Sequence, residues 1–148
     1  MGNAMAQETP FKLLKTLTGE YSDMTVDQLG NIYLVTAGGQ LRKTAPDGSV
    51  TAVFNEVRRY GKLYAIDVSN PLKTLLYYRD FGTVVVLDRF LNIRNVMDLR
   101  QSGLFQVKCL GQAYDNGYWV FDEQDGRVKH LNELAMVTDQ FTDFRLLF

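Results

Sequence analysis

The feature that most constrains the fold is an internal repeat, in which one pattern of short strands and tight turns occurs three times. Ile32 and Leu75 are 43 residues apart, and Leu75 and Trp119 are 44 apart. Spacings of 44 and 43 residues also separate a second set of anchors, Leu41, Val85 and Val128. Such a period indicates one supersecondary unit stacked several times, because a single unit of this size does not cover its own apolar surface.

Each repeat reads as four strands. The first strand ends near an aspartate (Asp27, Asp67 or Asp115), and after a turn the chain continues as NIYLVT, TLLYYRD or GYWVFDE. A tight glycine-containing turn leads to a third strand, and a fourth is clear in VTAVF and IRNVMDL but weaker in AMVTD. Asp-Gly and Asn-Gly pairs supply the positive φ that such hairpins need. The pattern predicts an all-β, β-propeller-like chain of about three four-stranded blades, since propeller blades have four strands and about 40–45 residues. A β-sandwich would explain the number of strands but not their recurrence.

The blades are expected at about 20–56, 62–99 and 104–140, within a propeller region that covers residues 10–148. Three blades are fewer than the roughly four to eight of known propellers. The chain is therefore either a partial propeller or half of a six-bladed ring. In such a ring the third unit of each copy packs on the first unit of the other. The segment FKLLKTLTG is expected to be an outer strand of a missing blade or one that closes the ring.

The predicted core follows the alternation along the second and third strands of each repeat. Its leucine, valine and tryptophan members are expected to be buried between adjacent blades. The alternating positions are Ile32, Leu34, Leu75, Tyr77, Trp119, Phe121, Val85, Leu87, Val128 and His130.

Residues 1–9 are interpreted as a leader or processing remnant. Asn3-Ala4-Met5-Ala6-Gln7 has the small-x-small pattern that precedes signal cleavage, but the apolar segment that normally lies upstream is missing. We therefore expect a periplasmic or outer-membrane-associated protein whose signal peptide is removed or absent, with the cytoplasm as the alternative.

Composition and charge narrow the classes of partner. Sixteen basic and seventeen acidic residues leave a net charge of −1, which argues against nucleic-acid binding by phosphate neutralisation. The longest apolar runs, such as Val84 to Leu87, are far shorter than the roughly 18 residues of a membrane-spanning helix. The one cysteine, Cys109, excludes an intramolecular disulfide and a multi-cysteine zinc site, and its apolar surroundings predict a buried, inert thiol.

The sequence predicts no catalytic, metal-binding or cofactor-binding residue. It contains no nucleophile elbow, zinc-protease, P-loop or dinucleotide-binding motif. His130, in RVKHLNE, is expected to have a surface or cross-strand role. Asp27, Asp67 and Asp115 are expected to occupy equivalent blade positions and to accept backbone N–H groups in the turns. A metal-ligand role at a central funnel is the alternative for these carboxylates.

Seven residues on loops are the candidate partner-binding residues. One basic cluster, Arg58-Arg59-Tyr60-Gly61-Lys62, lies between the first and second repeats and suits an acidic partner or an anionic glycan. Two turns combine arginine with phenylalanine, a composition that interfaces favour. The candidates are Arg58, Arg59, Tyr60, Arg79, Phe81, Arg89 and Phe90. We expect a protein partner or self-association, and these residues do not identify a ligand.

The segments SNPLKTLLYYRDFGTVVVLDRFLN and YDNGYWVFDEQDGRVKHLNE resemble the N-terminal half of uncharacterised β-propeller proteins from the cell envelope of Bacteroidetes-type bacteria. More broadly, the chain resembles NHL and YVTN-type propellers over roughly residues 10–148. The resemblance rests on turns and strand hydrophobics, so it implies the fold and the compartment but no catalytic residue. The expected function is a non-enzymatic binding or scaffold module of the bacterial cell envelope. The alternative is a lactonase-like, metal-dependent hydrolase funnel that further blades complete.

Overall fold

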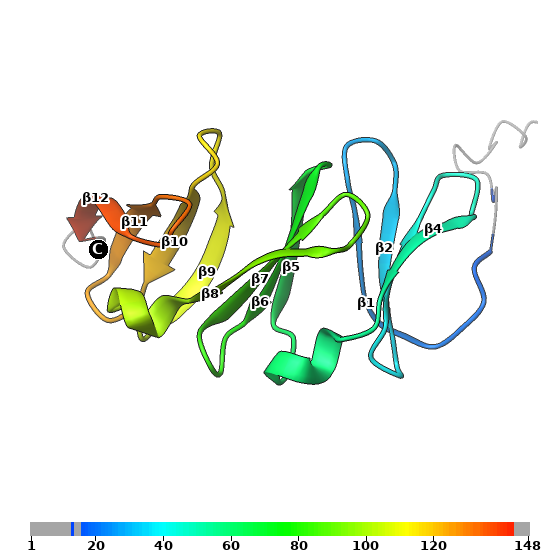
Figure 1. Cartoon of the computed structure of the whole chain (residues 1–148), viewed down its shortest axis with the longest axis horizontal. Helices are drawn as coiled ribbons and strands as arrows, with labels where there is room; N and C mark the ends of the chain where they lie inside the picture. Colours follow the sequence, from blue (N-terminus) through cyan, green and yellow to red (C-terminus); the bar gives the residue numbers. More distant parts are fainter. Residues whose placement is uncertain (1–12, 14–15, 144–148) are drawn as a thin grey trace, which may run out of the picture.

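The computed structural model describes residue 13 and residues 16–143, and the regular secondary structure of this part of the chain consists almost entirely of β-strands. Twelve strands form three separate antiparallel sheets of four strands each (Figure 1). The prediction of an all-β, propeller-type chain with three four-stranded units is therefore confirmed. The predicted leader, residues 1–9, lies outside the described residues.

In each sheet the strands follow one another in chain order, and each pairs with the next. The first sheet holds β1 (Tyr21–Val26), β2 (Ile32–Thr36), β3 (Leu41–Thr44) and β4 (Val50–Phe54). The second holds β5 (Ala65–Asn70), β6 (Lys73–Tyr78), β7 (Thr83–Asp88) and β8 (Ile93–Asp98). The third holds β9 (Val107–Gln112), β10 (Tyr118–Asp122), β11 (Arg127–Leu131) and β12 (Val137–Asp143). Two short 3-10 helices, η2 (Val57–Tyr60) and η3 (Leu99–Ser102), connect consecutive sheets. The strand expected in FKLLKTLTG is absent from its described residues, Leu13 and residues 16–19.

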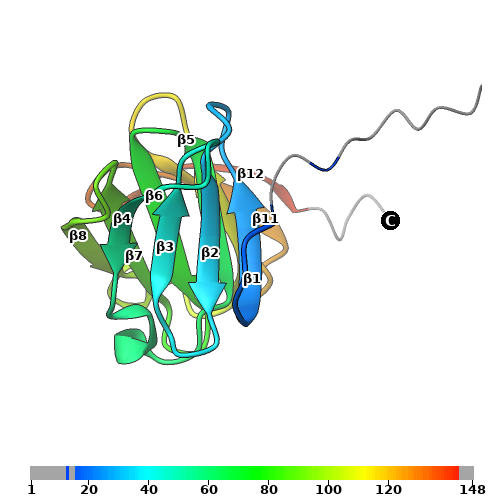
Figure 2. The same cartoon turned by 90° about the vertical axis from the view of Figure 1, so that its right-hand side faces the viewer.

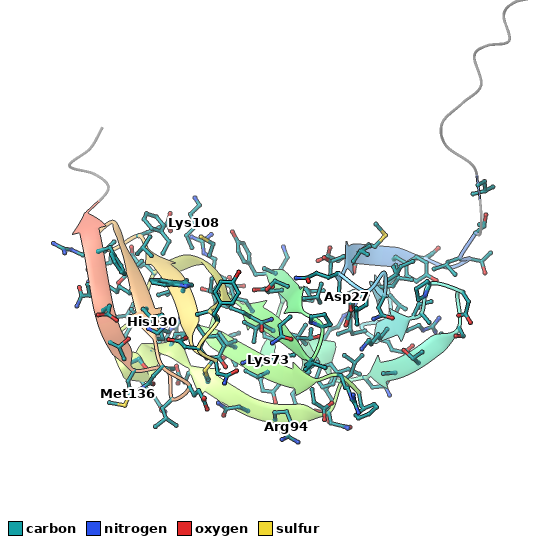
Figure 3. The ribbon with its side chains drawn as sticks, turned by 90° about the horizontal axis from the view of Figure 1, so that it is seen from above. Asp27, Lys73, Arg94, Lys108, His130 and Met136 are labelled. Carbon is teal, nitrogen blue, oxygen red and sulfur yellow. The ribbon has the colours of Figure 1, made fainter. Side chains whose placement is uncertain are left out.

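The three sheets stand side by side in an open row, and the ring is not closed. Figure 2 looks onto the first sheet with the other two behind it. The first strands of neighbouring sheets touch, β1 against β5 and β5 against β9. The three sheets fan out from these inner strands, as the view from above shows (Figure 3).

The stack has two ends. At one end, which we call the helical end, lie η2, η3 and the turns β2–β3, β6–β7 and β10–β11 (Figure 1). The remaining turns, β1–β2, β3–β4 and their equivalents in the other sheets, lie at the opposite end, which we call the hairpin end. No helix in the described part of the chain is long and apolar enough to span a membrane.

Apolar side chains fill the two spaces between the sheets. One cluster joins the first and second sheets and the other joins the second and third. The middle sheet is covered on both faces, so all four residues from Val84 to Leu87 are buried. A strand buried on both faces reads as a continuous hydrophobic run rather than as an alternation.

The alignment of the first repeat with the second is wrong by one residue. Tyr33 and Val35 of the first sheet face the second sheet, just as Leu75 and Tyr77 of the second sheet face the third. The sequence alignment instead treats Ile32, and not Tyr33, as the residue equivalent to Leu75. Leu34 lies on the free face of the first sheet and is nevertheless buried, beside a small cavity that Thr16–Thr18 also lines.

Two further predictions of burial are wrong. Trp119 lies on the face of the third sheet that points away from the second sheet, and 39% of its surface is exposed. Cys109, opposite Phe121 in the β9–β10 ladder, shares this free face and is exposed. Both residues face outward because no fourth sheet covers the third within the described chain.

Polar contacts also tie the sheets together, and most of them run from a side chain to a main-chain carbonyl. Each accepting carbonyl belongs to the neighbouring sheet or its connection. The donors and acceptors are Gln28 Nε2 and Ser69 O (2.9 Å), Lys43 Nζ and Arg89 O (2.9 Å), Gln112 Nε2 and Lys73 O (3.0 Å), and the Tyr77 hydroxyl and Val107 O.

Candidate functional site

The structure divides the seven candidate partner-binding residues between the two ends of the stack. Five of them gather at the helical end: Arg58, Arg59 and Tyr60 in η2, and Arg79 and Phe81 in the β6–β7 turn. The other two, Arg89 and Phe90, belong to the β7–β8 turn at the hairpin end. They therefore form two separate groups rather than one surface.

Arg58 holds a turn of its own sheet. Its guanidinium donates to the carbonyl of Ala37 in the β2–β3 turn and lies over Gly39, where a Cβ atom would come within 3.0 Å of it. Arg100 of η3 makes the same contact in the second sheet, donating to the carbonyl of Asp80. Sequence reasoning missed this shared role. Its signal is an acidic residue, an apolar residue and an arginine in succession at or just beyond the end of the fourth strand.

Arg79 ties the second sheet to the third. Its Nη2 lies 2.8 Å from Glu123 Oε2 in the β10–β11 turn, and its guanidinium stacks 5.2 Å from the ring centre of Tyr64. Phe81 rests against Gly61 yet remains 59% exposed. Arg59, which pairs with Glu56, is also exposed. Phe81 and Arg59 are thus the candidates at this end whose side chains are most open to a partner.

The three aspartates are engaged by nearby groups. Asp27 accepts hydrogen bonds from the main chain of Leu29 and Asn31 and from the Tyr33 hydroxyl. Burial alone raises the pKa of Asp27, but the hydrogen bonds from Asn31, Tyr33 and Leu29 outweigh it and hold the pKa below its usual range. Burial and the same contact raise the pKa of Tyr33 to about 12.

Asp67 and Asp115 do not occupy equivalent positions, which corrects the sequence alignment. Asp67 lies opposite Leu75 within the β5–β6 ladder, whereas Gly111 is the residue opposite Trp119, and Asp115 lies in the following turn. The Asp67 carboxylate accepts the N–H groups of Ser69 and of Gln112 in the third sheet, so it bridges two sheets.

His130 is buried in β11 and links two elements of the third sheet. Its Nε2 lies 3.0 Å from the carboxylate of Asp115, and its Nδ1 lies 2.7 Å from the hydroxyl of Thr138 in β12. Gly117 allows this approach, because a Cβ there would lie 2.2 Å from the Leu131 carbonyl. Hydrogen bonds from the Gly117 N–H and then from His130 lower the pKa of Asp115.

The Asp115 carboxylate determines which ring nitrogen of His130 carries a proton. Since Asp115 accepts, His130 Nε2 carries a proton, and Nδ1 then either accepts from the Thr138 hydroxyl or, in the imidazolium, donates to it. A hydroxyl–imidazole–carboxylate array that performs acyl transfer also needs donors for an oxyanion. The N–H groups of Leu134 and Met136 in the adjoining turn already donate to Asn132. The role that these contacts do show is structural: the side chains of Asp115, His130 and Thr138 hold the β9–β10 turn against β11 and β12.

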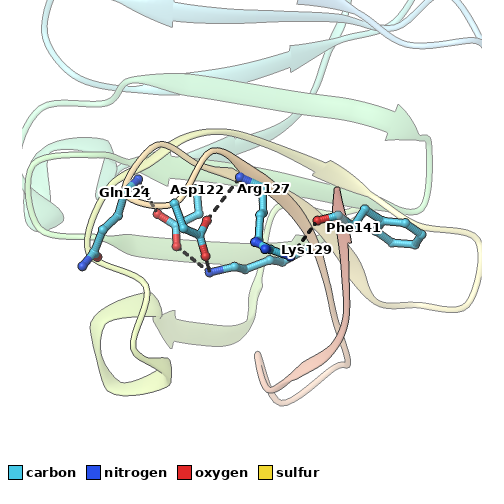
Figure 4. A network of polar contacts seen from close by, with 6 residues as sticks. Asp122, Gln124, Arg127, Lys129 and Phe141 are labelled. Atoms are coloured by element: carbon cyan, nitrogen blue, oxygen red, sulfur yellow. Dashed lines mark hydrogen bonds and ion pairs between the residues drawn. The ribbon is translucent and has the colours of Figure 1, made fainter. Parts of the chain in front are cut away.

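On the inner face of the third sheet, a buried ion network surrounds Lys129 (Figure 4). The Lys129 ammonium lies 2.7 Å from Asp122 Oδ2 and 2.8 Å from Asp125 Oδ2. Burial lowers the pKa of Lys129, but the two carboxylates raise it by more, so the net shift is upward.

The free face of the third sheet is aromatic. The Trp119 ring centre lies 4.8 Å from that of His130 and 5.5 Å from that of Phe141, which is 47% exposed. The free face of the first sheet is aliphatic. Met24 and Val26 of β1 and Val50 and Val53 of β4 are exposed on it. Both free faces thus carry several exposed apolar side chains, a feature that is typical of interaction surfaces when the side chains form a large patch.

No protein-family model and no curated protein matches this sequence. Solved structures do match its fold. A Bacteroides caccae protein of unknown function shares 15% identity at a TM-score of 0.57, with 86% of this chain and 51% of that chain covered. YCF48, solved bound to the D1 peptide, shares 11% identity at a TM-score of 0.60, with 95% of this chain and 46% of that chain covered. Virginiamycin B lyase from Staphylococcus aureus shares 10% identity at a TM-score of 0.56, with 80% of this chain and 40% of that chain covered.

The chain thus spans about half, or less, of the length of these similar structures. At identities this low, the structural similarity establishes the fold alone. Function stays open, since one of these structures is a peptide complex and another is an enzyme. Three antiparallel four-stranded sheets, arranged in an open row, have the fold of β-propeller blades.

Proposed function

We propose that this chain is a non-enzymatic binding and scaffold module of a bacterial cell envelope. We further propose that its free faces bind a second copy of the chain, so that two copies complete a ring. The resemblance to envelope propellers of Bacteroidetes-type bacteria supports the compartment. The helical end, with Phe81 and Arg59 exposed, is then the surface for a further protein partner.

One observation carries the proposal: the two free faces repeat the two sides of a contact that the chain already makes twice. Trp119 occupies the third-sheet position of Leu75, which packs against the neighbouring sheet and is 1% exposed. Leu34 lies at the position in the first sheet that Leu76 holds in the second and Val120 in the third. Leu76 and Val120 each pack against the preceding sheet. The third sheet of one copy therefore offers the surface that the first sheet of another copy is built to meet.

The resulting assembly has the dimensions of known propellers. Two copies of three sheets give six, which lies within the roughly four to eight blades of closed rings. A two-fold arrangement makes both new contacts identical and leaves neither apolar face in water. The similar solved structures, about twice as long as this chain, supply the same expectation of size.

The hydrolase alternative gains no support from the described residues. Asp27, Asp67 and Asp115 each accept main-chain N–H groups, Asp27 and Asp115 within their own turns and Asp67 also from Gln112 of the third sheet. No group of three or more His, Cys, Asp or Glu residues in the described chain is arranged to hold a metal ion.

Light scattering coupled to size exclusion tests the assembly. We expect the wild-type chain to have the mass of two copies at about 10 µM, well above a Kd of about 1 µM. Trp119→Asp places a charge in the contact and should give a single chain with an unchanged circular dichroism spectrum. Phe105→Asp is the matched control, since Phe105 is exposed outside both free faces, and it should retain the double mass. A monodisperse wild-type monomer would overturn the ring, and fractionation of the source bacterium tests the compartment separately.

A further inference from the structure

A cavity of about 390 Å³ opens at the hairpin end, away from the free faces and the helical end. Residues of all three sheets line it, among them Gln28 of the β1–β2 turn, Asn70 and Pro71 of the second sheet, and Gln112, Tyr114 and Asn116 of the third. Figure 3 looks onto this end, with Lys73 labelled near its centre. Its volume lies within the range of small-molecule sites, about 300–1,000 Å³.

None of the residues that line the cavity is charged, although 22% of the chain is. Four of them carry side-chain amides, and each amide offers two donors and one acceptor oxygen. The neighbouring Lys73 ammonium is held elsewhere, 5.3 Å from the ring centre of Tyr118. A phosphate or carboxylate group would thus leave water without gaining an opposite charge, so the cavity favours a polar ligand that is not anionic.

The cavity is built from its own hydrogen bonds, which position the amides. Gln28 Nε2 donates to Ser69 O at 2.9 Å, and Asn70 Oδ1 accepts from the N–H of Leu72. Gln112 Nε2 donates to the carbonyls of Lys73 and Asp67. These contacts bind the three sheets together around the cavity, so its walls are fixed before any ligand arrives.

Two of the four amides have a polar group without a hydrogen-bond partner in the described chain. Gln112 Oε1 is buried and has no hydrogen-bond partner among the described residues. Buried polar atoms are nearly always paired, and almost none of the surface of this oxygen is accessible, so a ligand hydroxyl reaches it only when the Gln112 side chain shifts toward the cavity. Within the same part of the chain, the Asn116 amide makes no hydrogen bond, and the Tyr114 ring stands fully exposed.

We propose that this cavity binds a neutral carbohydrate, with the Tyr114 ring as a platform for one sugar face and the amides as partners for its hydroxyls. A hydroxyl both donates and accepts, which matches an amide. The C–H face of a sugar ring carries slight positive charge and suits the negative face of an aromatic ring. The walls are strand ends and turns, which offer no continuous strand edge to an extended peptide.

Calorimetric titration of the full chain tests the site with three kinds of probe. These are neutral oligosaccharides (maltotriose, cellotriose, mannotriose and diacetylchitobiose), the anionic trigalacturonic acid, and the blocked peptide acetyl-trialanine amide. We expect at least one neutral sugar to bind with a Kd of about 1 mM or tighter, and neither other probe to bind.

Two variants locate the binding. Tyr114→Ala removes the platform and should weaken binding about tenfold or more. Asn116→Gly removes the amide without straining the turn, because Asn116 has a φ of 66° that glycine adopts freely, and it should weaken binding as well. Two control variants should leave the affinity for the sugar unchanged. They are Phe105→Ala, which removes an exposed aromatic side chain away from the cavity, and Trp119→Asp, which disrupts the proposed two-copy assembly.

Three results would overturn the proposal. They are no binding of any neutral sugar in the panel, sugar binding that survives both cavity variants, and binding of the peptide in place of sugars. Sugar binding by a chain that scatters light as a monomer would uphold the cavity while refuting the ring, so the two proposals fail separately.

Discussion

Lys129 shows how a single residue fixes the third sheet. It lies in the space between the second and third sheets, 8% exposed, with its ammonium shared by Asp122 and Asp125. Asp122 in turn accepts the main-chain N–H of Gln124, and Asp125 accepts that of Arg127. One buried cation thus positions both strands around the β10–β11 turn.

Removing this cation should be costly. We expect Lys129→Met to lower the free energy of unfolding by about 3–5 kcal/mol, because it leaves the Asp122 carboxylate buried without its partner. The double variant with Asp122→Asn should recover much of that loss. Arg59→Met, which breaks the exposed pair with Glu56, should leave the free energy of unfolding almost unchanged, because solvent screens this pair. Urea unfolding measures all three, and equal losses for Lys129 and Arg59 would contradict the burial of the network.

Asp27 makes stability depend on pH in the acid range. Its pKa in the folded chain is lowered, so it stabilises the fold fully above its unfolded value of about 4 and loses that contribution as pH falls through the lowered folded value. Asp27→Ala should therefore be less stable than wild type at pH 7 by about 2 kcal/mol, and the gap should narrow toward pH 2. Chemical denaturation across this range measures the gap, and a gap that widens in acid would refute the assignment.

At the scale of the strand, burial depends on which neighbour a face meets. Leu75 and Trp119 occupy the same position in successive sheets, but only Leu75 has a sheet packed against it. In the single chain we expect Leu75→Ala to cost about 2–5 kcal/mol. Trp119→Ala should cost about 1 kcal/mol, below the 3–5 kcal/mol typical of an interior tryptophan. The comparison is made at a dilution at which light scattering shows one chain. Equal losses would mean that Trp119 is covered within its own chain.

The sequence predicts the strands and their period because the glycine and aspartate turns recur at a fixed spacing. It fails on register at Ile32, because IYLVT is apolar on both faces and carries no alternation to show which face meets a neighbour. It fails on Cys109 because apolar surroundings in sequence do not tell whether a further sheet exists. The cavity at the hairpin end was missed for another reason. Its amides come from three repeats and share no motif.

At the scale of the whole molecule, the proposed ring makes thermal stability depend on concentration. Only folded chains associate. Raising the protein concentration from about 1 to about 100 µM should therefore raise Tm by a few degrees through mass action. Trp119→Asp should abolish the dependence and leave the Tm at its low-concentration value. Differential scanning fluorimetry over this range measures the effect, and a flat wild-type profile would count against the two-copy ring.

The side-chain contacts between sheets have a consequence for how such chains diverge. Gln28, Lys43 and Gln112 each reach a carbonyl oxygen of a neighbouring sheet or its turn, an atom that every amino acid supplies. The contact therefore depends on the identity of the donor, whereas the accepting position keeps it with any side chain as long as its backbone stays in place. Such one-sided dependence lets a blade be duplicated, exchanged or rewritten beside an unchanged neighbour.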